Sequence, residues 1–168
     1  QATAKDTISI GTGNVVSGQG SGAIGDPSVI QGTNSYSLGN NNAIGSASDN
    51  VLTLGGQNNV GATATRNGAG VITDTSTLTQ TQNVDRAFVL GYKNTIAATA
   101  DASDSVIIGN ENTVNAQNTM VLGNKVTATA ANNVILGNES SEDSATTTAG
   151  RANDIENGTV NGITYGSF

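Results

Sequence analysis

The sequence of 168 residues contains no cysteine, no histidine and no tryptophan, and it has a single proline. Without cysteine the chain can form neither disulfides nor thiolate metal sites, and it has no thiol nucleophile. Without histidine it lacks the usual general base of hydrolases and a common metal ligand. We therefore expect no metal, no cofactor and no enzymatic activity.

Positive charge is also scarce, with 6 basic residues against 13 acidic ones and a net charge of −7. A nucleic-acid-binding surface needs clustered bases, and none cluster here. The acidic residues keep no spacing that would aim two carboxylates at one point, which argues against a glycosidase-like pair. The bases are scattered along the chain at Lys5, Arg66, Arg86, Lys93, Lys125 and Arg151.

Long hydrophobic runs are missing as well. No segment approaches the roughly 18 apolar residues of a membrane-spanning helix. The opening QATAKDTISIGTG has neither the basic nor the apolar region of a signal peptide. We expect no membrane contact by this fragment.

Aromatic residues make up 3% of the chain and charged residues 11%, so a large Phe- or Trp-filled core is excluded. Glycine and asparagine, in contrast, each occur 22 times. Both residues adopt left-handed backbone conformations at low cost. This composition favours many tight corners around thin, repeated apolar layers.

Glycine follows Ile or Leu at regular intervals along most of the chain. The spacings between these glycines are 14, 14, 16, 36, 18, 14 and 14 residues. Self-similarity at a short fixed period is typical of a solenoid, in which each unit buries its apolar face by stacking on its neighbours. The glycines are Gly11, Gly25, Gly39, Gly55, Gly91, Gly109, Gly123 and Gly137.

A second apolar column lies five residues after six of these glycines, as at Val16, Ile30 and Val114, and it lapses to Ala128 in the seventh unit. Two apolar columns in 14 residues indicate two strands of about five residues and two corners of about two. The density of Gly and Asn disfavours a helix. The sequence therefore predicts an all-β fold, a parallel β-solenoid with 14-residue coils and corners near the Gly-Asn pairs.

The aliphatic residue before each glycine is predicted to point into its coil. These coil-interior anchors are Ile10, Ile24, Leu38, Leu54, Leu90, Ile108, Leu122 and Leu136. The residue before each anchor would then point outward, and in the C-terminal half it is apolar at Val89, Ile107, Val121 and Ile135. Because a coil cannot cover its own outer face, these four are candidate interface residues of a closed oligomer.

The longest interruption of the repeat is an insertion at residues 61–83. Its Thr- and Ala-rich flanks around Asn67-Gly68 predict a protruding β-hairpin. Three interpretations remain open: an arm that contacts a ligand, a clasp over a neighbouring chain, or a tolerated corner insertion. The candidate arm residues are Arg66, Asn67, Gly68 and Asp74.

The repeat stops after Gly137, which divides the chain into a repeat region at residues 1–138 and a polar segment at residues 139–168. Asn157-Gly158 and Asn161-Gly162 indicate tight turns between short strands there. We expect this segment to be the truncated beginning of a connector.

The stretches DSVIIGNENTV, NTMVLGN, NNVILGNE and NSYSLGNNNAIG share one pattern. Each has an Asn or Asp and a small polar residue, then an aliphatic pulse that ends in Gly-Asn. The chain resembles, over residues 6–138, the YadA-like head domains of trimeric autotransporter adhesins. The resemblance implies a left-handed parallel β-roll, a homotrimer, and export to the surface of a Gram-negative bacterium, anchored in its outer membrane and exposed.

The function implied by the resemblance is that of a non-enzymatic adhesin head in virulence. It would attach the cell to extracellular matrix, host cells or surfaces, and it would also self-associate. The alternative is a structural spacer in a long trimeric fibre, with no ligand of its own. A β-helical carbohydrate-active enzyme would need a cleft with converging carboxylates, which the repeat does not supply.

Overall fold

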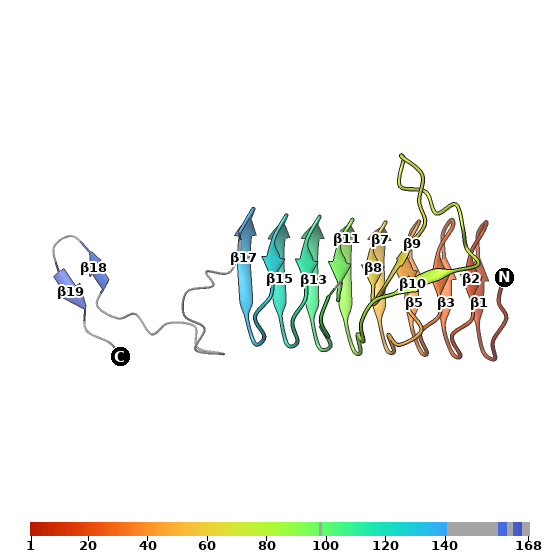
Figure 1. The fold of residues 1–168 in the computed structure, drawn as a ribbon, viewed down its shortest axis with the longest axis horizontal. Coiled ribbons are helices and arrows are strands. Elements are labelled where there is room, and N and C mark those ends of the chain that lie inside the picture. The colour runs from red at the N-terminus through yellow and green to blue at the C-terminus, as the bar shows by residue number, and fades with distance from the viewer. Residues whose placement is uncertain (98, 141–157, 161–162, 166–168) are drawn as a thin grey trace.

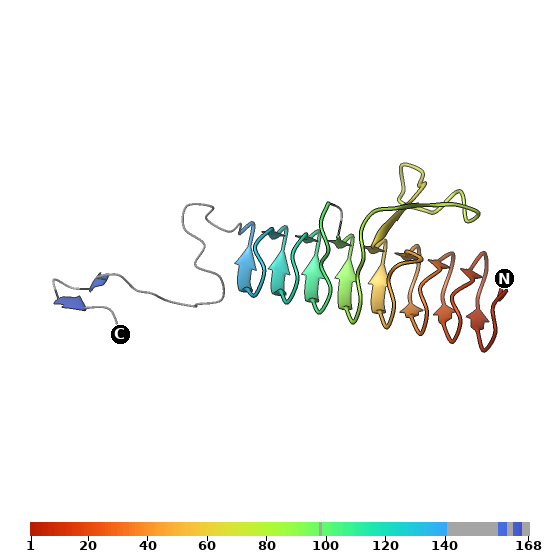
Figure 2. The same ribbon diagram turned by 60° about the horizontal axis from the view of Figure 1, so that its bottom comes forward.

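The computed structural model describes residues 1–97, 99–140, 158–160 and 163–165. Every regular element in these ranges is a β-strand, and most of the strands stack into a parallel β-solenoid (Figure 1). The all-β fold and the solenoid predicted from the 14-residue repeat are confirmed. Figure 2 shows the coils side by side along one axis, with the N-terminal coil at one end.

One wall of the solenoid, the long-strand sheet, contains eight parallel strands in the order of the coils. Equivalent residues of successive coils pair directly, as Val89 does with Ile107 and Gly91 with Gly109. The strands are β1 (Ile8–Ile10), β3 (Gly22–Ile24), β5 (Tyr36–Leu38), β7 (Leu52–Gly56), β11 (Phe88–Tyr92), β13 (Val106–Asn110), β15 (Met120–Asn124) and β17 (Val134–Asn138).

The opposite wall, the short-strand sheet, contains seven parallel strands of two residues each. Its register is the same from coil to coil, so that Val16 pairs with Ile30 and Ile96 with Val114. The strands are β2 (Val15–Val16), β4 (Val29–Ile30), β6 (Ala43–Ile44), β8 (Asn59–Val60), β12 (Thr95–Ile96), β14 (Thr113–Val114) and β16 (Thr127–Ala128).

The recurrence of glycine in each coil reflects a close approach of backbones at the end of each long strand. Gly91 and Gly109 both have φ 138°. A Cβ on Gly91 would lie 1.8 Å from the Gly109 carbonyl oxygen. The Asn after the glycine continues the strand, as Asn110 does, and the next residue makes the left-handed corner, as at Glu111 with φ 58°. The corner thus lies one or two residues later than the Gly-Asn pairs predicted.

In the interior of the roll, each coil contributes one inward side chain from each of the two sheets. The second residue of each long strand points inward, and Val89, Ile107 and Val121 are completely buried in the single chain. Opposite them lies the second predicted column, with Ile30, Ile96 and Val114 among its buried members, which confirms that column. Sheets that pack face to face lie only about 10 Å apart, so the space accepts one such side chain from each.

The prediction of which residues face inward was wrong for the long strands. The predicted coil-interior anchors point outward and are half-exposed or exposed. The predicted interface residues point inward instead: Val89, Ile107 and Val121 are fully buried, and Ile135 is partly buried against the core. Because side chains alternate with a period of two, a single wrong choice of phase exchanges the two sets. The anchors concerned are Ile10, Ile24, Leu38, Leu54, Leu90, Ile108, Leu122 and Leu136.

A buried ladder of polar side chains runs beside the apolar column. Asn94 donates from Nδ2 to the Gly109 carbonyl (2.7 Å), and its Oδ1 accepts the backbone N–H of Asn112 (3.0 Å). Asn58 and Asn112 repeat this pattern in adjacent coils. Each side chain thereby satisfies a corner carbonyl and a buried N–H of the next coil, as buried polar groups require. The ladder fixes the register between neighbouring coils.

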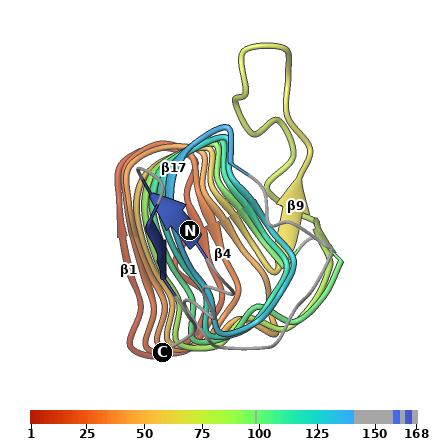
Figure 3. The same ribbon diagram turned by 90° about the vertical axis from the view of Figure 1, so that its left-hand side faces the viewer.

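The insertion leaves the roll between β8 and β11 and contains β9 (Ala62–Ala64) and β10 (Leu78–Gln80), which pair antiparallel. Figure 3 shows part of it rising beyond the outline of the stacked coils. Its base is tied to the roll, because the Thr81 hydroxyl donates to the Ala97 carbonyl (2.6 Å) and Ala62 is buried. The insertion is therefore anchored on the roll at its base.

Most of the predicted connector at residues 139–168 falls outside the described residues. Within it, β18 (Gly158–Val160) and β19 (Ile163–Tyr165) pair antiparallel, with Val160 opposite Ile163.

Candidate functional site: an open apolar face and an inserted arm

The outer side of the long-strand sheet carries two columns of large apolar side chains. They come from the residues on either side of each inward-pointing residue, and their exposure reaches 67% at Leu136 in one column and 69% at Val134 in the other. We call this surface the apolar face. It consists of Ile8, Ile10, Ile24, Tyr36, Leu38, Leu52, Leu54, Phe88, Leu90, Val106, Ile108, Met120, Leu122, Val134 and Leu136.

The in-register pairing of the strands makes the apolar face continuous. Leu90 lies beside Ile108, and Ile108 beside Leu122, so the columns run as stripes along the solenoid axis, with one gap at Gly22. Gly22 is the only member of the columns without a side chain. Soluble monomers rarely expose a contiguous apolar surface of this extent. The arrangement is suited to burial against another protein surface.

Sequence reasoning found both sets of residues and exchanged their roles, although the sizes of the side chains carried a usable signal. The inward column contains only small or β-branched residues, such as Ser37, Thr53 and Ile107. The outer columns contain Tyr36 and Phe88, which a thin roll cannot accommodate. Val and Ile occur on both sides, so the signal is that Leu, Met, Tyr and Phe occur in the outer columns alone.

In the inserted arm, Arg66 is bound to the roll. Its guanidinium donates to the carbonyl of Asn41 (2.6 Å), to the carbonyl of Gly70 (3.2 Å) and to Oδ1 of Asn59 (2.8 Å). Burial lowers the pKa of Arg66 from its usual value, while Tyr92 acts in the opposite direction. The backbone N–H of Ile72 adds a bond to Asn41 Oδ1 (2.8 Å). Arg66 therefore fixes the outer part of the arm against a corner of the roll.

The other three candidate arm residues lie beyond this attachment. Asn67 Oδ1 accepts the N–H groups of Ala69 and Val71, each at 3.0 Å, and so closes the tip around Gly68. Asp74 accepts bonds from the hydroxyls of Ser76 and Thr77, which lower the pKa of its carboxyl. The structure brings Arg66, Asn67 and Gly68 together at one pocket, whereas Asp74 does not line that pocket.

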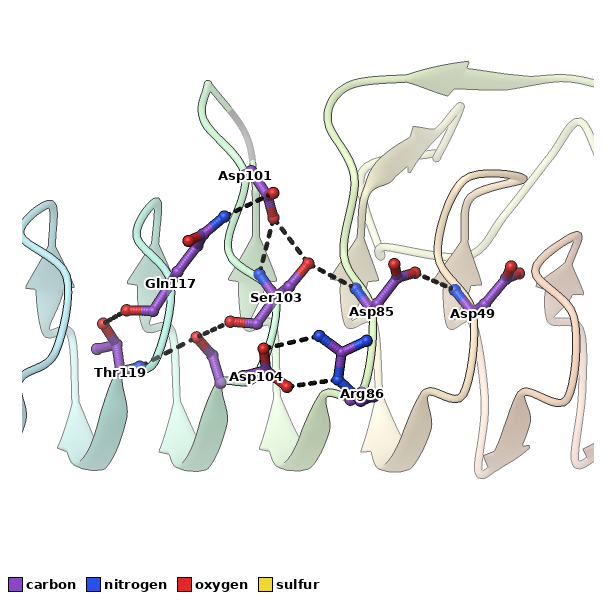
Figure 4. A network of polar contacts seen from close by, with 9 residues as sticks. Asp49, Asp85, Arg86, Asp101, Ser103, Asp104, Gln117 and Thr119 are labelled. Carbon is purple, nitrogen blue, oxygen red and sulfur yellow. Dashed lines mark hydrogen bonds and ion pairs between the residues drawn. The ribbon is translucent and has the colours of Figure 1, made fainter.

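A second polar network, which the sequence analysis missed, follows the other corner of the roll (Figure 4). Asp85 accepts the backbone N–H of Asp49 (3.1 Å) across neighbouring coils. The Ser103 hydroxyl accepts the N–H of Asp85 (2.9 Å) and donates to Asp101 (2.7 Å), which also accepts a bond from Gln117 (2.8 Å). A sequence signal for this network exists, because a polar residue precedes the left-handed corner residue in successive coils. These residues are Asp49, Asp85, Ser103 and Gln117.

Beside this network, Arg86 and Asp104 form a bidentate ion pair with distances of 2.6 and 2.8 Å. Hydrogen bonding to Arg86 lowers the pKa of Asp104, and the same contact raises the pKa of Arg86. Both residues occupy left-handed corner positions. The network and the ion pair connect successive coils, which is a structural role.

Within the described residues, no group of three or more acidic, histidine or cysteine side chains could hold a metal ion. In the same part of the chain, no helix has the length and apolar character that a membrane crossing requires.

The apolar face and the inserted arm are thus the two surfaces with features beyond those that hold the roll together. Comparisons of this chain with models of protein families, with curated proteins and with solved structures found no match.

Proposed function

We propose that this chain is a head segment of a trimeric, YadA-like surface fibre and that it acts in attachment without catalysis. In this proposal three chains form a left-handed β-roll assembly on the exposed surface of a Gram-negative bacterium. The observation that carries the proposal is the apolar face, which extends along all eight long strands. The surface position and the trimer follow the resemblance of the repeat to such heads.

Burial of the apolar face would supply the energy of assembly. Covering one Leu, Ile or Val side chain contributes about 1.5–3 kcal/mol, and each chain presents many such side chains, already partly covered by their neighbours. Even a fraction of this total exceeds the several kcal/mol of entropy lost on association. Stripes parallel to the solenoid axis suit a closed ring of chains, because every coil then meets a coil of the neighbouring chain.

The other surfaces of the roll and the protruding hairpin arm would remain free for attachment. Eight strands at about 4.8 Å make a rod of roughly 40 Å, which presents the same surface three times. Several weak contacts held together in this way gain an avidity of about 10² to 10⁴ over one contact. Extracellular-matrix proteins, cell-surface molecules and further copies of the fibre are the candidate partners.

The oligomeric state tests the assembly directly. Sedimentation equilibrium should give about three times the chain mass of 16.7 kDa. Leu122→Glu introduces a charge into the apolar face and should dissociate the assembly. Thr127→Glu is the matched control, because Thr127 is exposed on the short-strand sheet of the same coil. A folded, stable monomer of the unchanged chain would overturn the proposal.

The alternative role of a spacer differs in what the arm does. Replacing the outer arm, residues 65–77, by a short turn leaves β9 and β10 in place. If the chain is a head, the shortened protein should assemble normally but attach less to matrix proteins and cells. Unchanged attachment by a correctly assembled variant would favour the spacer.

A further inference from the structure

A pocket of about 360 Å³ lies between the tip of the insertion and a corner of the roll. We call it the arm pocket. The roll contributes the corner residue Gln57, Asn59 at the start of β8, and the corner residue Lys93 after β11. The pocket is lined by Gln57, Asn59, Arg66, Asn67, Gly68, Ala69, Gly70 and Lys93.

The arm pocket collects positive charge and contains no carboxylate among its lining residues. Five basic residues lie in the described ranges, and three of these pair with an acid: Lys5 with Asp6, Arg86 with Asp104 and Lys125 with Glu139. Within the same ranges, Arg66 and Lys93 have no ion pair. In a chain with a net charge of −7, both of these cations line one pocket.

The contacts of Arg66 leave its charge uncompensated. All three of its hydrogen bonds go to neutral oxygens, those of Asn41, Gly70 and Asn59. A guanidinium has five N–H donors, so donor capacity remains. Because the side chain is half-buried, an anion beside it would be screened less by water than at an open surface. Structural attachment of the arm needs the neutral bonds alone and leaves the second cation, Lys93, unexplained.

An exposed aromatic ring adjoins the arm pocket. Tyr92 precedes Lys93, whose Nζ lies 5.3 Å from the centre of its ring, and Tyr92 is 41% exposed. The ring lines a neighbouring hollow of about 470 Å³ with Gly39, Gly55, Gly56 and Gln57 among its other residues. Gln57 belongs to both, so the charged pocket and the aromatic surface are contiguous.

This combination matches the chemistry of an acidic sugar. The side-chain amides of Asn59 and Asn67 use their oxygens within the protein, on Arg66 and on two backbone N–H groups, and keep their NH2 groups as donors for hydroxyl groups. Gln57 donates one N–H to the Ala69 carbonyl and keeps a second. An exposed ring flanked by glycines offers a flat surface for the apolar side of a sugar ring. An acidic peptide could use the cations but would make little use of a flat ring beside three amides.

We propose that the arm pocket binds a saccharide that carries a carboxylate or sulfate group, with the anion between Arg66 and Lys93 and the sugar ring beside Tyr92. The inference names a ligand class for the attachment role proposed above, and only its biological meaning rests on that role. Three copies in one assembly would raise the avidity of a weak single site.

The test is a titration of the full chain with small saccharides, followed by NMR chemical shifts of the Lys93 and Gly68 amides. The probes are N-acetylglucosamine 6-sulfate, glucuronic acid and neutral N-acetylglucosamine, together with an Asp-containing peptide. At least one anionic sugar should bind, about tenfold or more tightly than the neutral sugar. The two anionic probes distinguish sulfate from carboxylate, and either one supports the proposal.

Variants locate the site. Lys93→Gln should weaken binding of the anionic sugar about tenfold, and Tyr92→Ala should weaken it as well. Lys125→Gln is the matched control, because Lys125 has the same left-handed corner position but pairs with Glu139 outside the pocket. It should leave binding unchanged. Arg66→Gln is interpreted only if the amide shifts of β9 and β10 show that the arm stays attached.

The proposal is overturned if neither anionic sugar binds, if the neutral sugar binds equally well, or if only the peptide binds. It is also overturned if Lys93→Gln and Lys125→Gln have the same effect. Sedimentation of the same samples separates this inference from the proposed assembly. Loss of the trimer with sugar binding retained contradicts the assembly, whereas a trimer that binds no sugar contradicts the pocket.

Discussion

The N-terminal coils and the C-terminal coils have the same register but different interiors. In the first four long strands the inward residue is Ser9, Ala23, Ser37 or Thr53, whereas the last four have Val89, Ile107, Val121 and Ile135. Both halves nevertheless stack in one continuous sheet. The corners and polar ladders therefore determine the coil, whereas the interior of the long-strand sheet can vary in polarity.

The inward side chains make hydrogen bonds in the N-terminal half and apolar contacts in the C-terminal half. In the N-terminal half the buried Ser37 hydroxyl accepts a hydrogen bond from Nδ2 of Asn42 (2.9 Å), so a polar group is paired. In the C-terminal half, Val89, Ile107 and Val121 stack directly on one another in the apolar core. Thr53 lies at the boundary, and its buried hydroxyl has no hydrogen-bond partner in the described part of the chain. The halves should therefore respond differently to the same type of substitution.

The largest effect is expected from Ile107→Ala in the C-terminal interior. Removing a fully buried Ile side chain and leaving a cavity lowers the free energy of unfolding by about 2–5 kcal/mol. Ser37→Ala in the N-terminal interior should cost only about 0.5–1.5 kcal/mol, because Asn42 keeps its bond to the Gly55 carbonyl. Urea unfolding at one fixed protein concentration measures both, and equal losses would contradict the difference between the halves.

A smaller loss is expected from Asn94→Ala, which interrupts the buried ladder. The change leaves the Gly109 carbonyl and the Asn112 N–H without their side-chain partner, at a cost of about 1–3 kcal/mol. Ser28→Ala is the comparison in the N-terminal half, where the Ser28 hydroxyl accepts the Asn42 N–H (3.1 Å) but donates to the Gly39 carbonyl over a longer 3.4 Å, so the loss should be smaller. Hydrogen exchange of the Asn112 amide should accelerate in the first variant. An unchanged rate would show that the ladder does not hold the coils.

A gain in stability is expected from Thr53→Val at the boundary between the halves. The substitution keeps the shape of the side chain and removes the unpaired hydroxyl, which should raise the free energy of unfolding by about 1 kcal/mol. Thr113→Val, on the outer side of the short-strand sheet, should change it little. Urea unfolding of the two variants in parallel tests this, and a loss of stability in Thr53→Val would mean that the hydroxyl has a partner.

The smallest effect concerns pH. Bonding to Arg86 depresses the pKa of Asp104 in the folded chain below the usual value of about 3.9. The pair therefore stabilises the fold above that pH and loses this contribution as the pH falls through the depressed value. Arg86→Gln should raise the pKa of Asp104 in an NMR titration. It should also reduce the decrease in Tm that the unchanged chain shows at acid pH. An unchanged pKa would exclude the ion pair in solution.

Much of the architecture was predictable because it depends on the regular spacing of glycine and aliphatic residues along the chain. The 14-residue period and the column at Ile30 and Val114 are confirmed by the structure, whereas the corners lie one or two residues beyond the predicted Gly-Asn pairs. The candidate site was predicted less well. Hydrophobic periodicity located the right strands, but hydrophobicity alone cannot tell the inner from the outer side of a strand that is apolar on both sides. Ile107 and Leu122 were therefore assigned to each other's faces.

The arm shows the same limit. Asn67-Gly68 indicated a tight turn, and the sequence also drew attention to Arg66. The association of Arg66 with Asn41 and of the arm tip with Lys93 joins residues more than 20 positions apart. No local pattern encodes such contacts, because they depend on where the insertion lies on the roll.

The sequence by itself determined that the chain is a repeated, two-stranded coil, because stacking of in-register strands needs the same residue types at the same interval. It also determined where neighbouring backbones approach most closely, because only glycine leaves room for the carbonyl of the next coil at the end of each long strand. The tertiary structure alone decided which side of the long strands is inside. The narrow space between the two sheets accepts a small or β-branched side chain from each coil, and the larger Leu, Tyr, Phe and Met side chains are left on the outside.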